Sequence, residues 1–168
     1  MGSLLEKITP DERGVVDKHR AQVPVRVSAL AQELGLEIVL AALSPNISGM
    51  IEPSDTAANG YKIKINKFEK EERQRFTAAH EISHYLLHRE YIKNGIVDSA
   101  LYRSNLSSYK ETQANKLAAD ILMPVEAVRA ALNDLGGQKT DDNARVLASE
   151  FKVSVPAMKV RLGMGEYA

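Results

Sequence analysis

Two histidines and a glutamate in the stretch RFTAAHEISHYLLH, residues 75–88, have types and spacing that could do chemistry. On an α-helix, at about 100° per residue, His80 and His84 lie about 40° apart and one turn along the axis, so both imidazoles can approach one ion. Glu81 is rotated about 100° from His80 and can reach a water bound to that ion. In this H-E-x-x-H pattern two neutral imidazoles hold zinc and the glutamate takes a proton from water. Five-residue matches also arise by chance on surface helices, so the metal-site interpretation needs support from other residues of the chain.

A catalytic zinc usually has three protein ligands, so a third ligand is needed. The chain contains no cysteine, which leaves His, Asp or Glu. His88 extends the histidine stripe but lies about 12 Å along the axis from the first histidine, too far to share its ion. We expect His88 to support the site or to end the helix.

Three acidic residues remain as candidates for the third ligand. Glu90 lies close to the expected end of the histidine helix, and Asp98 lies in a segment that reads as a loop. Glu111 lies on a second predicted helix, where small alanines would let the two helices pack closely. A glutamate in the first turn of a helix is also common for its interaction with the helix dipole alone. Glu111 therefore has the best context, although its spacing does not exclude the other two.

Positioning these side chains requires long helices, and the sequence predicts them. Nothing between Glu69 and His88 is Gly or Pro, and Asn66 with Glu69 has the spacing of a capping box. The second helix, YKETQANKLAADILMP at 109–124, carries Glu111 and ends at a proline. We therefore expect the first helix to carry both histidines and the second to approach it.

Shorter elements precede the histidine helix. VRVSALAQELG, at 25–35, has apolar residues at helical spacing and ends at a glycine. Three apolar or alternating runs predict strands, and these are LEIVLAAL at 36–43, ISGMIE at 47–52 and YKIKIN at 61–66. The turn-rich PSDTAANG between the last two predicts a hairpin, and the lysines of the last strand suit an exposed face or an edge.

The last part of the chain reads as helices. PVEAVRAALNDLGG, at 124–137, begins with a proline and ends with glycines, and ARVLASEF and VPAMKVRLG form a helix, a turn and a helix. We therefore predict a single α+β domain over 1–168, mostly helical, with a small three-stranded antiparallel or mixed sheet beside the H-E-x-x-H helix. An N-terminal helical extension occupies 1–22, and a pair of helices that resembles a helix-turn-helix occupies 138–168.

Composition and charge narrow the class of partner. The 168 residues are 44% hydrophobic, enough for one core. Lys plus Arg is 22 and Asp plus Glu is 22, so no overall basic field would hold nucleic acid or an anionic membrane. The N-terminus lacks the apolar run of a signal peptide, and no stretch approaches the roughly 20 apolar residues of a membrane span. These features favour a cytoplasmic protein.

The C-terminal helix pair carries little net charge. From residue 138 onward we count five basic residues (Lys139, Arg145, Lys152, Lys159, Arg161) and four acidic ones (Asp141, Asp142, Glu150, Glu166). A net charge of about +1 is poor for contacts to phosphate. We therefore expect the pair, through Val155 and Leu162, to pack on the core, and we do not expect direct binding to nucleic acid.

The quoted stretches resemble the ImmA/IrrE family of zinc metallopeptidases. The resemblance rests on RFTAAHEISHYLLH and ETQANKLAADILMP, and it extends to VPVRVSALAQELGLEI, to the strands that lead into IKIN, and to LASEFKVSVPAMKVRLG. It covers most of the chain. At Leu117 the family often has Phe, a conservative change in the core.

This resemblance implies a site and a role. It implies that His80, His84 and Glu111 bind one Zn²⁺ per chain and that Glu81 is the general base. It also implies cytoplasmic regulatory proteolysis, typically of helix-turn-helix repressors encoded nearby, often on mobile elements or in stress-response loci. The candidates for supporting the ligands or contacting substrate are His88, Asn115, Tyr85 and Tyr109. The group that stabilises the oxyanion is left open among Tyr85, Tyr102, Arg103 and Tyr109.

Two questions stay open at the level of sequence. An extended substrate could add to the strand at 61–66 or at 47–52, although both are also ordinary sheet strands. The second question is whether the protein cleaves its partner. A zinc-containing regulatory protein of the toxin–antitoxin type, which binds without proteolysis, needs the same ligands, and a DNA-binding regulator is the third alternative.

Overall fold

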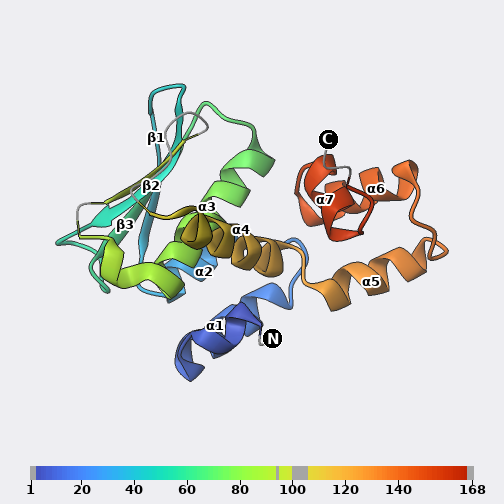
Figure 1. Cartoon of the computed structure of the whole chain (residues 1–168), viewed down its shortest axis with the longest axis horizontal. Coiled ribbons are helices and arrows are strands. Elements are labelled where there is room, and N and C mark those ends of the chain that lie inside the picture. The colour runs from blue at the N-terminus through green and yellow to red at the C-terminus, as the bar shows by residue number, and fades with distance from the viewer. Residues whose placement is uncertain (1–2, 94, 100–105, 166–168) are drawn as a thin grey trace.

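The computed structural model describes residues 3–93, 95–99 and 106–165, and within them it has seven α-helices and a four-stranded mixed sheet (Figure 1). In chain order the elements are η1 Leu4–Lys7, α1 Pro10–Arg20, α2 Val27–Glu33, β1 Glu37–Ala41, β2 Ile47–Pro53, β3 Tyr61–Asn66, α3 Glu71–His88, η2 Arg89–Tyr91, β4 Ile96–Ser99, α4 Ser108–Leu122, α5 Val125–Asp134, α6 Asp141–Phe151 and α7 Val155–Arg161. The predicted α+β class is confirmed. No helix among these residues is both long and apolar enough to cross a membrane.

The sheet has the strand order β1-β3-β2-β4. The predicted hairpin is confirmed, because β2 and β3 pair antiparallel, with Gly49 opposite Ile65. β1 pairs parallel with β3, and β4 pairs antiparallel with β2. The fourth strand was not predicted, since its four residues lie in a segment that reads as a loop.

The position of β2 and β3 corrects one expectation. Both are inner strands, so their backbone groups already pair on both sides and neither can accept an extended substrate at a free edge. Within the described residues the edges belong to β1 and β4. The lysines of β3 therefore mark an exposed face and no edge, and Lys64 pairs there with Glu52 at 2.8 Å. Alternation along one strand cannot reveal a parallel partner that comes from elsewhere in the chain.

The predicted capping box at the start of the histidine helix is wrong. α3 begins at Glu71, and its N-cap residue Lys70 makes no side-chain capping bond. The Asn66 side chain instead donates to the carbonyls of Leu43 and Ser44 in the β1–β2 loop and of Ile47 at the start of β2, the last at 2.8 Å. The Glu69 carboxylate accepts from the Ser48 hydroxyl at 3.0 Å. Tertiary contacts thus use both polar groups and move the helix start by a few residues.

The histidine-bearing helix α3 approaches the sheet closely at one glycine. A Cβ atom placed on Gly49 of β2 would lie 2.6 Å from Thr77 Cγ2 and 2.9 Å from the Lys64 carbonyl oxygen. Such separations are far inside van der Waals contact, so only glycine lets α3 pack here. Thr77 lies one turn before His80, and this contact therefore positions the site.

One hydrophobic cluster runs from Leu5 in η1 to Leu162 beyond α7. In Figure 1 the sheet and α5–α7 lie at opposite ends of the molecule, with α3 and α4 between them. The C-terminal pair contributes fully or nearly fully buried side chains to the cluster, namely Leu147, Phe151 and Met158. The expectation for Leu162 is confirmed, and Val155 is half-buried against the same cluster.

Candidate metal centre

Two helices bring the predicted ligands together. His80 and His84 lie on α3, and Glu111 lies in the first turn of α4, which packs along α3 through Ala114 and Ala118. His80 Nε2 lies 3.1 Å from one oxygen of Glu111, and His84 Nε2 lies 3.1 Å from the other. One ligand atom from each of the three residues can be chosen so that all lie within 4.8 Å of one another.

This arrangement fits a metal ion. Zinc bonds of about 2.0–2.2 Å in tetrahedral geometry place ligand atoms roughly 3.3–3.6 Å apart. Each histidine lies near this separation from one of the two Glu111 oxygens. With one ligand atom per residue the three lie within 4.8 Å of one another, so small side-chain movements would bring them around one ion. His84 is fully buried, and the Glu111 side chain is 19% exposed, so the group lies at the margin of the core and opens towards solvent on the carboxylate side.

Glu81 is the fourth member of the sequence motif. It follows His80 on α3 and is fully buried. Helical geometry turns it about 100° from the first histidine, so it borders the metal group without belonging to the three ligands. Burying a carboxylate costs free energy unless it is paired or hydrogen-bonded. The burial of Glu81 next to the two histidines therefore indicates that this carboxylate has a role in the site.

His88 lies at the end of α3 and contacts the second histidine. Its Nδ1 is 3.0 Å from His84 Nδ1, and its Nε2 is 2.9 Å from Oε1 of Gln113 on α4. Burial lowers the pKa of His88 below its ordinary value, and the Gln113 hydrogen bond acts in the opposite direction. His88 therefore lies on the side of His84 that faces away from Glu111. Sequence reasoning missed Gln113, because nothing in its type or spacing distinguishes it from an exposed helical glutamine.

The tyrosine and asparagine candidates fall in different places. Tyr85 is buried, packs against Tyr61 with ring centroids 5.7 Å apart, and has the Arg89 guanidinium 4.1 Å from its ring. Burial raises the pKa of Tyr85 above its ordinary value. Tyr109 is 68% exposed and Asn115 is exposed, both on α4.

The other candidates for the third ligand or the oxyanion group are less informative. Glu90 is exposed on η2 and is absent from the group of ligand atoms. Asp98 lies on β4, but its side chain is outside the described part of the chain, as are Tyr102 and Arg103 entirely. Among the residues that the structure describes, Glu111 is the acidic partner of the two histidines.

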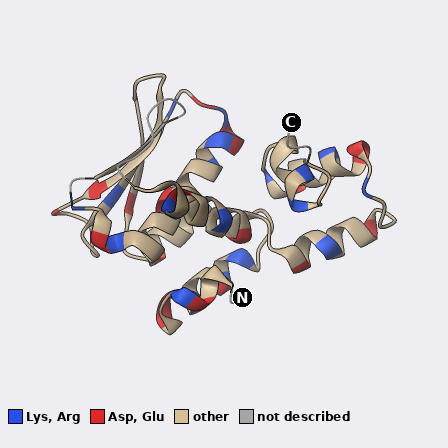
Figure 2. Cartoon of the chain, viewed as in Figure 1, with Lys and Arg blue, Asp and Glu red and all other residues tan. Residues whose placement is uncertain are grey.

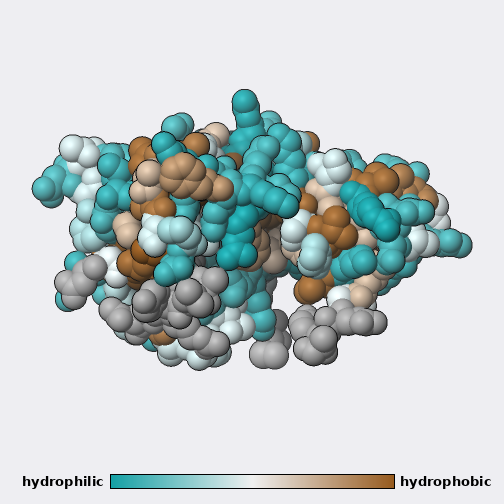
Figure 3. Space-filling view, turned by 90° about the horizontal axis from the view of Figure 1, so that it is seen from above, coloured by the Kyte–Doolittle hydropathy of each residue, from teal (hydrophilic) through white to brown (hydrophobic). Residues whose placement is uncertain are grey.

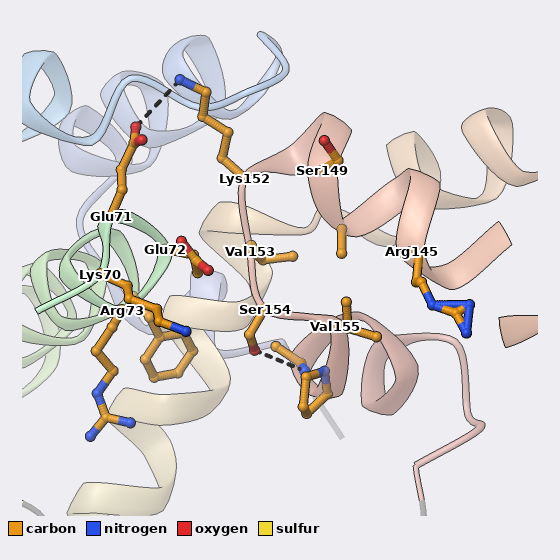
Figure 4. A pocket seen from close by; sticks show the side chains of 14 residues that line it. Lys70, Glu71, Glu72, Arg73, Arg145, Ser149, Lys152, Val153, Ser154 and Val155 are labelled. Carbon is orange, nitrogen blue, oxygen red and sulfur yellow. Dashed lines mark hydrogen bonds and ion pairs between the residues drawn. The ribbon is translucent and has the colours of Figure 1, made fainter. Parts of the chain in front are cut away.

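A groove of about 880 Å³ lies away from the histidines, between the first turn of α3 and the α6–α7 pair (Figure 4). Lys70, the N-cap residue of α3, and Glu72 of α3 line one side of it, and Arg145 of α6 lines the other. Lys152 spans one end by pairing with Glu71 at 3.3 Å. The space-filling view shows the molecular surface notched where the α5–α7 part meets the rest (Figure 3).

Comparison with known proteins agrees with this geometry. The family model described as the IrrE N-terminal-like domain, peptidase family M78, matches residues 31–163. The match spans α3 and α4 and therefore the whole His-His-Glu group. A search of curated proteins finds no match. With most of its length matched, including the candidate centre, the chain belongs to the IrrE N-terminal-like peptidase family.

Proposed function

We propose that this protein is a zinc-dependent endopeptidase that performs regulatory cleavage of a helix-turn-helix repressor encoded nearby. The observation that carries the proposal is the convergence of His80, His84 and Glu111, with Glu81 buried beside them, in a chain of a peptidase family. Three protein ligands leave one tetrahedral position open, which is typical of catalytic zinc and not of structural zinc.

The donor set supports zinc as the ion. Two imidazoles and one carboxylate, without thiolate, form the ligand type of zinc peptidases, and the close separation of their atoms suits a small tetrahedral ion. The Glu111 carboxylate also supplies one negative charge against the double charge of the ion. We expect one Zn²⁺ per chain.

Peptide hydrolysis follows from the roles of the side chains. When bound, zinc supplies Lewis-acid activation of a water molecule and of the scissile carbonyl. Glu81 accepts the proton of the attacking water and returns it to the leaving amine, as a general base that becomes a general acid. The burial of Glu81 keeps bulk water away from the transferred proton and strengthens its electrostatic interactions. Asn115 and Tyr109 are exposed on α4, and we expect them to contact substrate.

The resemblance supports a protein substrate, and we place the reaction in the cytoplasm, where repressors act on DNA. We expect the repressor to be encoded by a neighbouring gene, on a mobile element or in a toxin–antitoxin or stress-response locus. The α6–α7 pair is a scaffold in this proposal. Basic and acidic residues both occur along the ribbon of α6 and α7 (Figure 2), and their near balance in number disfavours contact with nucleic acid.

A second function is favoured by one observation, the groove between α3 and α6–α7. Its volume is about 880 Å³ and it combines charged walls with apolar residues such as Phe76 and Val155, so it could hold a partner segment. A zinc-containing protein that regulates its partner by binding alone would use such a surface and would not need Glu81 as a base.

Substitution of Glu81 separates the two functions. Glutamine has nearly the same shape but cannot accept a proton from water, so Glu81→Gln should keep zinc, fold and partner binding while losing turnover. General bases contribute about 100-fold to 10,000-fold in rate, a loss that is plain on a gel. Glu90→Gln makes the same chemical change on an exposed surface and serves as the control.

The adjacent repressor should be co-expressed with each variant, and its fragments and the activity of its target promoter followed together. Fragments with the wild type and Glu90→Gln but not with Glu81→Gln would support proteolysis. Equal derepression with all three proteins and no fragments with any would refute it and establish regulation by binding. Salt-sensitive binding of the intact protein to operator DNA would revive the DNA-binding alternative.

A further inference from the structure

We propose that Gln113 and His88 are positioning residues that select the tautomer of His84 required for metal binding. The inference rests on the proposed metal site. It concerns a chain of hydrogen bonds that starts on α4, crosses to the end of α3 and terminates at the second histidine ligand.

The geometry is a continuous line of polar atoms. Gln113 Oε1 lies 2.9 Å from His88 Nε2, and His88 Nδ1 lies 3.0 Å from His84 Nδ1. His84 Nε2, on the other side of its ring, lies 3.1 Å from Glu111. His84 is fully buried and His88 is 3% exposed, so water cannot easily replace either bond. The line therefore supplies the hydrogen-bond partners of His84 Nδ1 and of both His88 nitrogens.

The direction of the protons follows from the ends of the line. An amide oxygen only accepts, so His88 Nε2 must carry a proton and donate it to Gln113. In the neutral ring His88 Nδ1 is then an acceptor, and His84 Nδ1 must donate to it. With its proton on Nδ1, His84 has a lone pair on Nε2, the atom that faces Glu111. The Gln113–His88 line thus favours the lone pair on His84 Nε2 that a metal needs, whereas the Glu111 carboxylate, which only accepts, favours a proton on that nitrogen until a metal binds.

The opposite direction is incompatible with metal binding. A rotated Gln113 amide would donate to His88 Nε2, His88 Nδ1 would donate to His84 Nδ1, and the His84 proton would move to Nε2. A protonated Nε2 cannot be a ligand. Whether the side chain at position 113 accepts or donates a hydrogen bond therefore decides whether His84 Nε2 is free to bind a metal.

This polarity can be varied at one position. Gln113→Glu keeps an acceptor, Gln113→Leu removes the hydrogen bond, and Gln113→Lys offers only donors. All four side chains have similar helix propensity, so α4 itself should be unaffected. Zinc affinity, measured by competition with a chelator, should follow the order Glu at least equal to Gln, then Leu, then Lys. Loss of such a supporting contact typically lowers metal affinity about 10-fold to 100-fold, and we expect that loss for Leu and more for Lys.

Two controls separate polarity from charge and from packing. Thr112 is exposed on the same turn of α4, so Thr112→Glu and Thr112→Lys add the same charges without a contact to His88, and they should change affinity much less. In a His88→Phe background the line is cut, and the Gln113 substitutions should then differ from one another no more than the Thr112 pair does. Thermal unfolding confirms that each variant is folded.

Nuclear magnetic resonance provides a readout that does not depend on affinity. Long-range ¹H–¹⁵N correlation spectra of the metal-free protein, labelled at histidine nitrogens, report which ring nitrogen carries the proton. We expect the Nε2–H tautomer for His88 and, in Gln113→Lys, its loss. An Nδ1–H tautomer for wild-type His88, or equal affinity of the Leu, Lys and wild-type proteins, would overturn the inference while leaving the metal site intact. A wild-type protein that does not bind zinc would overturn the metal site and this inference with it.

Discussion

Glu111 is the residue on which the candidate centre depends, because its two oxygens each face one histidine at 3.1 Å. His80 and His84 are joined by one helical turn, and their spacing is a local property of α3. The carboxylate comes 27 residues after His84, from a different helix, so only the packing of α4 on α3 makes the three a group. The consequence for metal binding is testable residue by residue.

Replacing any of His80, His84 or Glu111 with alanine should lower zinc content below one per chain. Removal of one of three ligands leaves two, too few for a stable tetrahedral site, and the histidine variants should lose the metal almost completely. Elemental analysis of purified protein measures this, with Glu90→Ala as the exposed control. Full zinc in both histidine variants would contradict the assignment. Loss of zinc in Asp98→Ala, with zinc retained in Glu111→Ala, would move the third ligand to β4.

At the scale of elements, the sheet and the helix α3 meet through Gly49 and Thr77, one turn before His80. The close approach leaves no room for a Cβ atom. α3 also has a second attachment, at its first turns, where Arg75 Nε donates to the Lys152 carbonyl at 3.1 Å. The two attachments hold the helix that carries both histidines between the sheet and the C-terminal pair.

Gly49→Ala should lower the free energy of unfolding by about 1–3 kcal/mol, the usual cost of overpacking a core. The new methyl group would meet Thr77 Cγ2 and the Lys64 carbonyl. Adding Thr77→Ser, which deletes Cγ2, should recover part of the loss, because the clash with the backbone oxygen remains. Chemical denaturation of the four proteins of this double-mutant cycle measures the coupling. Additive effects would show that the two groups do not meet.

Lys152 ends α6 with a left-handed backbone, at φ 53°. A side chain costs about 1–2 kcal/mol in this conformation and glycine avoids that cost. Lys152→Gly should therefore be about 1 kcal/mol more stable than Lys152→Ala, since both remove the exposed ion pair with Glu71 and only glycine relaxes the backbone. Denaturant midpoints provide the comparison. An alanine variant as stable as the glycine variant would argue against the left-handed turn.

At the scale of the whole molecule, the α6–α7 pair is continuous with the core. Its large buried side chains are Leu147, Phe151, Met158 and Leu162. Burial of one such side chain contributes about 1.5–3 kcal/mol, and a domain of this kind has a total stability of about 5–15 kcal/mol. Exposing the part of the core that these side chains cover is therefore costly on the scale of the total stability.

Truncation after Gly137 should accordingly give insoluble or unfolded protein, although α3 and α4 remain complete. The truncated chain keeps every candidate ligand, so a loss of zinc and solubility together would reflect the fold and not the site. Circular dichroism and size-exclusion chromatography, with the full chain as control, measure the outcome. A truncated protein that stays folded and hydrolyses peptide bonds would show that the pair is dispensable.

Much of this protein could be predicted from local patterns. The long helix with His80 and His84 on one side, the helix ends at Gly and Pro, and the β2–β3 hairpin all follow from interactions within a few residues. These patterns can be recognised without knowledge of the rest of the fold, because helical periodicity and turn conformation are properties of neighbouring residues. They sufficed to predict the class of fold and two members of the metal group.

The remaining features depend on residues that are distant in the sequence. The strand order, which places β2 and β3 inside the sheet, depends on a parallel partner and on a short fourth strand. The use of Asn66 and Glu69 in loop contacts replaced the capping box that their spacing predicted. The sequence favoured Glu111 over two other acids, and the packing of α4 on α3 brought it to the histidines, together with Gln113 behind them. Spacing along one helix or strand predicts which of its side chains share a face. Which side chains they meet on another element depends on how the two elements pack, and this packing depends on the whole core.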